Sequence, residues 1–134
     1  MVNGDLVIDS NVYYNATQVF DVKNIASVAW IVRGDLIISP QVSTLSGAFF
    51  VIGDDTLDGS YDGAVVTQPV TATQLVVYGL MMARSFDLQR NYQGVFGNDE
   101  PSELFYYDGR AVLNIPPGLR DFTTTLPLIT ADEN

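Results

Sequence analysis

The turn between residues 54 and 62 carries the side chains best suited to bind a metal ion. Its candidate ligands are Asp54, Thr56, Asp58 and Asp62. Ca²⁺ takes about six to eight oxygen ligands, and Gly59 stands at the sixth place of the turn, where a calcium loop bends sharply. The twelfth place holds Val65 instead of a bidentate acid, so the match is partial. We predict either a calcium site with these ligands or an acidic solvent loop without an ion, since Asp-Gly turns are frequent in loops.

Glu100 and Glu103 stand three residues apart, and an acid/base pair for sugar hydrolysis could be proposed from them. The chain holds 16 acidic residues, so one such pair is weak evidence, and Pro101 between them indicates a turn. We expect both to be solvated, or one of them to pair with Arg90 or Arg110 and tie the end of the chain to the last strands. We therefore predict no catalytic residue and no enzymatic activity.

Exposed aromatic side chains could bind a sugar, because a pyranose face packs well on a ring. The candidates are Tyr13, Tyr14, Trp30, Tyr61, Tyr78, Tyr92, Phe105, Tyr106 and Tyr107. Trp30 lies in the apolar run 28–32, which favours a place in the core. Tyr106 and Tyr107 are neighbours on an extended segment, so they should point to opposite faces, one packed and one exposed.

The composition excludes several classes of partner and reaction. The chain has no cysteine and no histidine, which removes thiol chemistry, thiolate metal sites and the usual base at neutral pH. Six basic residues against 16 acidic ones give a formal net charge of −10. Nucleic acids and anionic membranes bind positive surfaces, so we expect neither as a partner. We expect no membrane insertion, because no apolar run is long enough for it, and no leader within these residues, because the first residues lack a basic region followed by an apolar one.

A repeat of 30 residues is the main evidence for the fold. Residues 4–12 (GDLVIDSNV) and 34–42 (GDLIISPQV) share Gly, Asp, Leu, Ile and Val at equivalent positions. Apolar runs rich in Val, Ile, Phe, Tyr and Leu are bounded by Gly, Asp, Asn, Ser or Pro, which indicates strands. The sequence predicts an all-β fold, a short parallel β-solenoid in which equivalent apolar positions stack. An antiparallel β-sandwich is the alternative, although the Asn-Gly and Asp-Gly pairs do not lie between paired strands.

Looser, glycine-led copies of the repeat begin at Gly79 and Gly47, where we expect glycine to mark corners. Residues 54–72 are predicted to form an insertion between coils, with one short edge strand. The solenoid domain then spans residues 1–120, and residues 121–134 form a flexible C-terminal tail.

The two ends of a solenoid expose unpaired backbone groups and an apolar cross-section. Either the segments 105–119 and 6–12 cap these ends, or neighbouring copies stack on them. Strand-like sequence begins within three residues of Met1, so we also expect the chain to be a piece of a longer protein.

The apolar runs at 30–39, 47–53 and 75–88 resemble the bactofilin-like modules, right-handed β-helices that polymerise at bacterial cell envelopes. The second half is similar to the C-terminal signature of large surface proteins from uncultivated bacteria of the candidate phyla. The matching strings are GLMMA (79–83), FDLQR (86–90), EPSE (100–103), FYYDGR (105–110) and LNIPPGL (113–119). Gly109 and the insertion depart from that pattern. The resemblance covers residues 28–120; it implies a right-handed solenoid at the cell surface and transfers no catalytic residue.

The sequence therefore predicts a non-catalytic structural or assembly module of a bacterial surface protein, able to associate with itself or with neighbouring domains. We expect an extracellular or cell-surface location, because the chain has one lysine, no cysteine and many Thr, Ser, Asn and Gly residues. A carbohydrate-binding or adhesion domain is the alternative, with a glycan as its ligand.

Overall fold

The computed structural model describes residues 1–14, 25–54, 62–94, 100–114, 116 and 119. These residues form eight strands and one single-turn helix. They are β1 (Leu6–Ile8), β2 (Ala29–Val32), β3 (Leu36–Ile38), β4 (Thr44–Val51), β5 (Ala64–Thr67), β6 (Leu75–Ala83), β7 (Ser85–Leu88), β8 (Glu103–Tyr107) and α1 (Arg110–Leu113). In this described part, no helix is long and apolar enough to cross a membrane.

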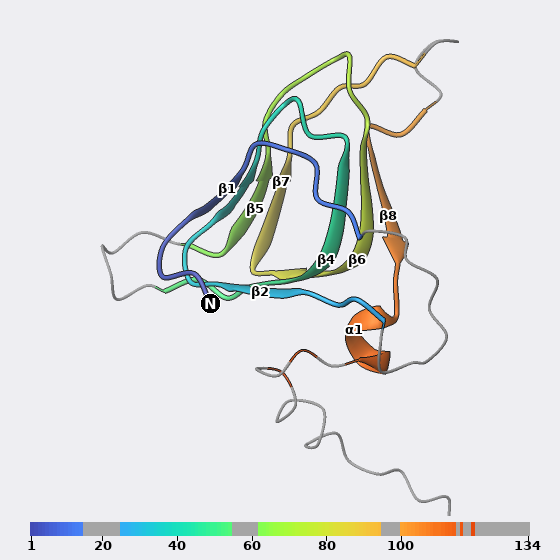
Figure 1. Cartoon of the computed structure of the whole chain (residues 1–134). Coiled ribbons are helices and arrows are strands. Elements are labelled where there is room, and N and C mark those ends of the chain that lie inside the picture. The colour runs from blue at the N-terminus through green and yellow to red at the C-terminus, as the bar shows by residue number, and fades with distance from the viewer. Residues whose placement is uncertain (15–24, 55–61, 95–99, 115, 117–118, 120–134) are drawn as a thin grey trace, which may run out of the picture.

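Two four-stranded sheets make up the fold, with the strand orders β1-β3-β5-β7 and β2-β4-β6-β8. Every pair of neighbouring strands is parallel. Consecutive strands alternate between the sheets, so each circuit of the chain, here called a coil, returns beside the previous one (Figure 1). The predicted all-β class is confirmed, and the alternative of an antiparallel sandwich is wrong.

The 30-residue repeat is the register between the first two coils of one sheet. Leu6 pairs with Leu36, and Ile8 pairs with Ile38. Alternate side chains of a strand point to the same face, so these residues stack in two columns that turn inward. Leu36 and Ile38 are fully buried, and burial of such a side chain stabilises the fold by about 1.5 to 3 kcal/mol.

The second sheet contributes further inward columns. Leu45 of β4 pairs with Val77 of β6, and both are buried. Trp30 pairs with Phe49 and packs against the core, which confirms the core position expected for the tryptophan. The interior is therefore mostly aliphatic and aromatic, with Thr67 as a fully buried polar residue.

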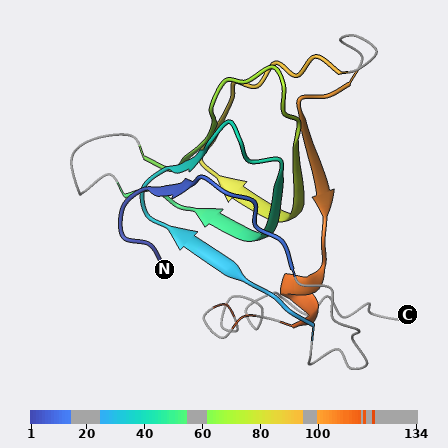
Figure 2. The same ribbon diagram turned by 45° about the horizontal axis from the view of Figure 1, so that its top comes forward.

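Gly47 and Gly79 pair near the middle of β4 and β6. Both strands bend along their length (Figures 1 and 2). A Cβ on Gly79 would overlap the carbonyl oxygen of Gly47. The close approach of the two backbones requires glycine at position 79, and the expectation that glycine marks a corner holds here.

Two expectations about the middle of the chain are wrong. The run that begins at Gly79 belongs to the second sheet; the third copy of the repeat is β5, whose Val65 pairs with Leu36. β5 lies between β3 and β7, so it is an interior strand and not an edge strand within an insertion. The spacing of 29 residues fits the repeat, but Ala64 replaces the aspartate that marks the first two copies. Residues 121–134, the predicted tail, lie outside the described residues.

The Gly-Asp pair of the repeat recurs because its aspartate bonds to the next coil. Asp5 Oδ1 accepts the backbone N–H of Asp35 at 2.8 Å. Asp35 Oδ1 in turn accepts the N–H groups of Gly63 and Ala64, each at 2.8 Å. A carboxylate oxygen that accepts backbone N–H groups makes a charge-assisted hydrogen bond, so each aspartate fastens one coil to the following one.

Asp35→Ala should lower the free energy of unfolding by about 2 kcal/mol, because it leaves two backbone N–H groups of the third coil without their acceptor. Asp35→Asn keeps an Oδ1 acceptor and should lose less. Urea unfolding measures both, with Asp9→Ala, an exposed aspartate of β1's C-terminal turn, as the matched control. A loss no larger than that of the control would contradict the proposed role of Asp35.

Candidate functional site

Arg90 lies in the interior, where a charged side chain needs several polar partners. Its Nη2 donates to the carbonyl of Ser39 at 2.9 Å, and its Nη1 donates to the carbonyl of Val42 at 2.7 Å. Nη1 also donates to the carbonyl of Thr73 at 3.3 Å. Arg90 follows β7, whereas Ser39 and Val42 follow β3 and Thr73 precedes β6. The guanidinium therefore joins three successive passages of the chain.

Glu103 begins β8 beside this arginine. Its Oε1 accepts the hydroxyl of Thr67 at 2.8 Å and the backbone N–H of Arg90 at 3.3 Å. Burial lowers the pKa of the Arg90 guanidinium below its ordinary value of 12.5, and the Glu103 carboxylate acts in the opposite direction. The sequence predicts that one glutamate pairs with Arg90 or Arg110. Glu103 does lie beside Arg90, but its hydrogen bond goes to the backbone N–H and not to the guanidinium. Glu100 is exposed, so the two glutamates differ in surroundings.

The acidic turn predicted to bind calcium begins and ends within the described residues. Asp54 is buried and forms an ion pair with Arg33 of the preceding coil. Asp62 is half-buried, and its backbone lies against Gly53, so the two ends of the turn meet. Thr56 and Asp58 lie outside the described residues. No group of three acidic side chains gathers as metal ligands among the residues that are described. Calcium binding at this turn stays a prediction.

A melting experiment decides the calcium prediction. A site formed by Asp54, Thr56, Asp58 and Asp62 should raise the melting temperature in Ca²⁺ relative to EDTA, because an ion bound only by the folded chain stabilises it. Asp58→Asn with Asp62→Asn should abolish that difference. Equal melting temperatures in Ca²⁺ and EDTA would leave an acidic loop without an ion.

Tyr78 and Tyr106 form a stacked pair on the outer face of the second sheet. Their ring centroids are 5.5 Å apart with planes inclined by 15°, and the side chains are 43% and 51% exposed. Tyr107 lines the opposite face, as expected for the neighbour of Tyr106. The expectation that one of these two would be packed is wrong: β8 is the last strand of its sheet, so both are exposed. Tyr61 lies outside the described residues.

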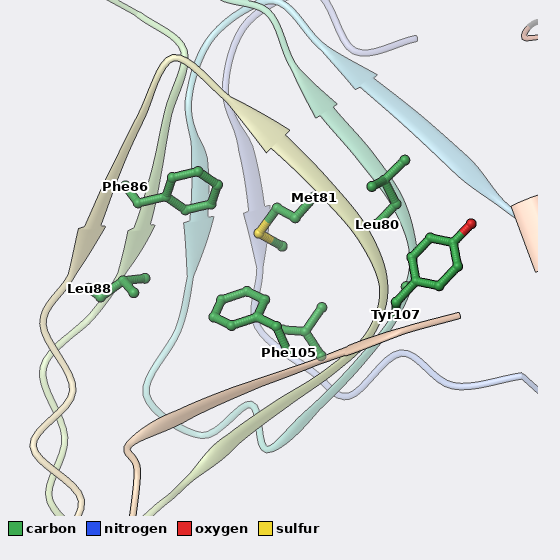
Figure 3. A pocket seen from close by; sticks show the side chains of 8 residues that line it. Leu80, Met81, Phe86, Leu88, Phe105 and Tyr107 are labelled. Atoms are coloured by element: carbon green, nitrogen blue, oxygen red, sulfur yellow. The ribbon is translucent and has the colours of Figure 1, made fainter. Parts of the chain in front are cut away.

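The last coil encloses an apolar groove of about 450 Å³. The side chains labelled in Figure 3 come from β6, β7 and β8: Leu80, Met81, Phe86, Leu88, Phe105 and Tyr107. Phe86, Met81 and Phe105 point toward one another across the interior of this coil (Figure 3). We call this surface the open end. Exposed solenoid ends are expected from the sequence, but these residues are not assigned to one. Phe86 and Leu88 continue the columns of β3 and β5, and Phe105 continues the column of β4 and β6.

The segment after β8 lies against the first part of the chain. The Arg110 guanidinium stands 4.7 Å from the centre of the Tyr14 ring, and Asn114 Nδ2 donates to the carbonyl of Ile25 at 2.7 Å. Arg110 also pairs with Asp108 at 3.1 Å. Residues 105–107 form most of β8 and α1 packs beside Tyr14, so the expected cap formed by segment 105–119 is not seen over the described residues of the open end.

Comparisons with known proteins identify no relative of this chain. The chain matches no protein-family model, no curated protein and no solved structure.

Proposed function

We propose that this chain is a non-catalytic structural and assembly module of a bacterial cell-surface or envelope protein. In this proposal the stacked coils form a short right-handed parallel β-solenoid. Its role is to provide a stiff unit that binds other copies of the chain or neighbouring domains. Because a solenoid buries its apolar residues between coils, its stiffness comes from contacts repeated along its axis.

One observation carries the proposal: interior and corner polar groups are directed at the backbone of another coil. Asp35 accepts two N–H groups of the third coil, and Arg90 donates to carbonyls that follow β3. Asn11 Oδ1 accepts the N–H groups of Ser43 and Thr44, at 2.8 and 3.0 Å. These groups hold coils in register, which is the work expected of a scaffold.

The handedness rests on a general property of parallel sheets. A connection between two parallel strands of one sheet is right-handed in about 98% of cases, because a right-twisted strand packs back onto the sheet in that sense. Each passage from β1 to β3, and from β3 to β5, is such a connection. An experimental electron-density map would decide this part of the proposal.

The extracellular location and the bacterial source rest on composition and on the resemblance of residues 28–120. Detection of the intact protein by antibody or by protease treatment of whole cells tests the location. Signal only after the cells are broken would contradict it.

The alternative is a carbohydrate-binding or adhesion domain, and the exposed pair Tyr78 and Tyr106 is the observation that favours it. Sugar rings pack on exposed aromatic faces, so a glycan site here would depend on both rings. From the structural proposal we expect no selective signal on a glycan array for the wild-type chain.

Binding that is lost in Tyr78→Ala with Tyr106→Ala would overturn the structural proposal in favour of this alternative. Tyr13→Ala is the matched control, because Tyr13 is exposed but lies outside the pair. Circular dichroism of each variant shows whether the fold is retained.

A further inference from the structure

The inward columns of the fold all finish at the open end without a covering coil. Leu36 and Val65 are fully buried, while Phe86, the next residue in their column, is 48% exposed. In the second sheet, Val77 is buried and its partner Phe105 is 47% exposed. The open end therefore presents the same kind of surface that the coils bury against one another elsewhere.

The backbone at this end is also incompletely paired. β4 pairs with β6 along Thr44–Val51, and β2 covers the other side of its second half. β8 pairs with β6 only over Leu75–Gly79, so among the described residues no strand covers the outer side of Leu80–Ala83. β7 and β8 are themselves the last strands of their sheets. Free strand edges beside an apolar groove are a surface that pairs readily with another chain.

At the opposite end of the stack, where β1 and β2 are the first strands of their sheets, the inward side chains are less exposed. Ile8 occupies the first place of a column and is 8% exposed, whereas Leu88 occupies the last place of the same column and is 44% exposed. Leu6 is half-buried, in contrast to Phe86. A stack of copies joined head to tail needs an exposed apolar surface at both ends, and the described residues offer such a surface at one end.

We propose that the open end binds the open end of a second copy, which gives a closed two-fold dimer instead of a filament. A two-fold contact places the same patch of each copy against the other, so a surface rich in Phe, Leu and Met is its own complement. Phe86 and Phe105 are the central residues of this contact. The inference rests on the proposed structural function and names its partner and its surface.

Charge sets the conditions under which the dimer forms. Each copy carries a formal charge of −10, so two copies repel each other in dilute buffer. Added salt screens this repulsion. Salt does not screen the apolar contact between the two copies. The dimer should therefore tighten as NaCl is raised.

Sedimentation velocity of the full chain, over a range of protein and NaCl concentrations, tests the proposal. We expect a monomer–dimer equilibrium that shifts toward dimer with salt. Phe86→Ser with Phe105→Ser should raise the dimer dissociation constant by at least about tenfold, since central aromatic residues dominate such contacts. The matched control is Val7→Ser, because Val7 is 58% exposed on the outer face of β1 and its loss should leave the constant unchanged.

A cysteine variant covers the case in which the serine variant does not fold. The natural chain has no cysteine, so Tyr107→Cys introduces a single thiol at the open end. A short bis-maleimide should link two copies of this variant far more than two copies of Tyr13→Cys, whose residue lies outside the open end.

Three results would overturn the proposal. A monomer at every concentration rejects the contact, and a series of species larger than a dimer rejects its two-fold form. A full chain that is monomeric, with dimers formed only after truncation at Leu119, would show that residues 120–134 cover the open end. None of these results bears on the glycan-array test, so the proposed function and the dimer can fail separately.

Discussion

Arg90→Ala should lower the free energy of unfolding by about 4 kcal/mol, the largest loss that we expect from a single side-chain deletion. The guanidinium is buried and donates to the carbonyls of Ser39, Val42 and Thr73. Its removal takes a donor from each of these carbonyls, although the Ser39 carbonyl keeps the N–H of Val42 at 3.2 Å. It also leaves the Glu103 carboxylate without a nearby cation, and loss of one buried charged partner typically costs about 3 to 5 kcal/mol. Urea unfolding followed by the fluorescence of Trp30, the single tryptophan, measures the change.

Two variants give this prediction its controls. Arg90→Lys keeps the charge but not the planar group that bonds to several carbonyls, so we expect a smaller loss than in Arg90→Ala. Arg110→Ala removes an arginine whose side chain is 43% exposed and paired with Asp108, and it should cost about 1 kcal/mol or less. Equal losses at positions 90 and 110 would show that Arg90 does not hold the coils together.

Gly79→Ala should destabilise the chain by about 3 kcal/mol or more, because the added Cβ would overlap the carbonyl oxygen of Gly47. The two strands cannot both keep their pairing and make room, since the contact is between backbones. The change should appear as a lower urea midpoint, or as loss of the β-sheet circular dichroism signal if the variant does not fold.

Substitutions at two other glycines serve as controls that separate the effect of the overlap from the other effects of a glycine-to-alanine change. At Gly109 a Cβ would contact only the Tyr107 ring, at 3.7 Å, and φ is −72°, so Gly109→Ala should be close to neutral. At Gly4 nothing lies within 4 Å of a Cβ but φ is +123°, so Gly4→Ala should cost about 1 to 3 kcal/mol through backbone strain alone. Stability of Gly79→Ala equal to that of Gly109→Ala would contradict the close backbone approach.

The two large effects concern the same physical problem, which is how a chain without cysteine keeps narrow coils in register. Arg90 acts from inside, and the paired glycines allow β4 and β6 to turn together. At the open end no further coil follows, so neither an interior arginine nor a glycine pair fixes the next layer. The assembly role that we propose for this end would follow from the way in which the stack is built.

The sequence by itself determined the class of the fold and the register of its first two coils. Apolar runs of strand length, without helical spacing, allow little besides β-structure. The register of the copies that begin at Gly4 and Gly34 can be read from the sequence, because Asp5 and Asp35 each accept a backbone N–H of the next coil. The absence of histidine and cysteine likewise limits the chemistry that the side chains can perform, wherever the fold places them.

Only the tertiary structure decided which later runs stack on these copies. β5 lacks the aspartate, and the run at Gly79 has the glycine but belongs to the other sheet, so local similarity pointed to the wrong strand. Coil lengths differ because the corners carry excursions, and stacking depends on which residues meet across coils and not on their spacing in the chain. For the same reason, the sequence did not predict the interior position of Arg90 or the residues of the open end. The carbonyls that bind Arg90 come from distant segments, and the open end is exposed because no further coil follows it.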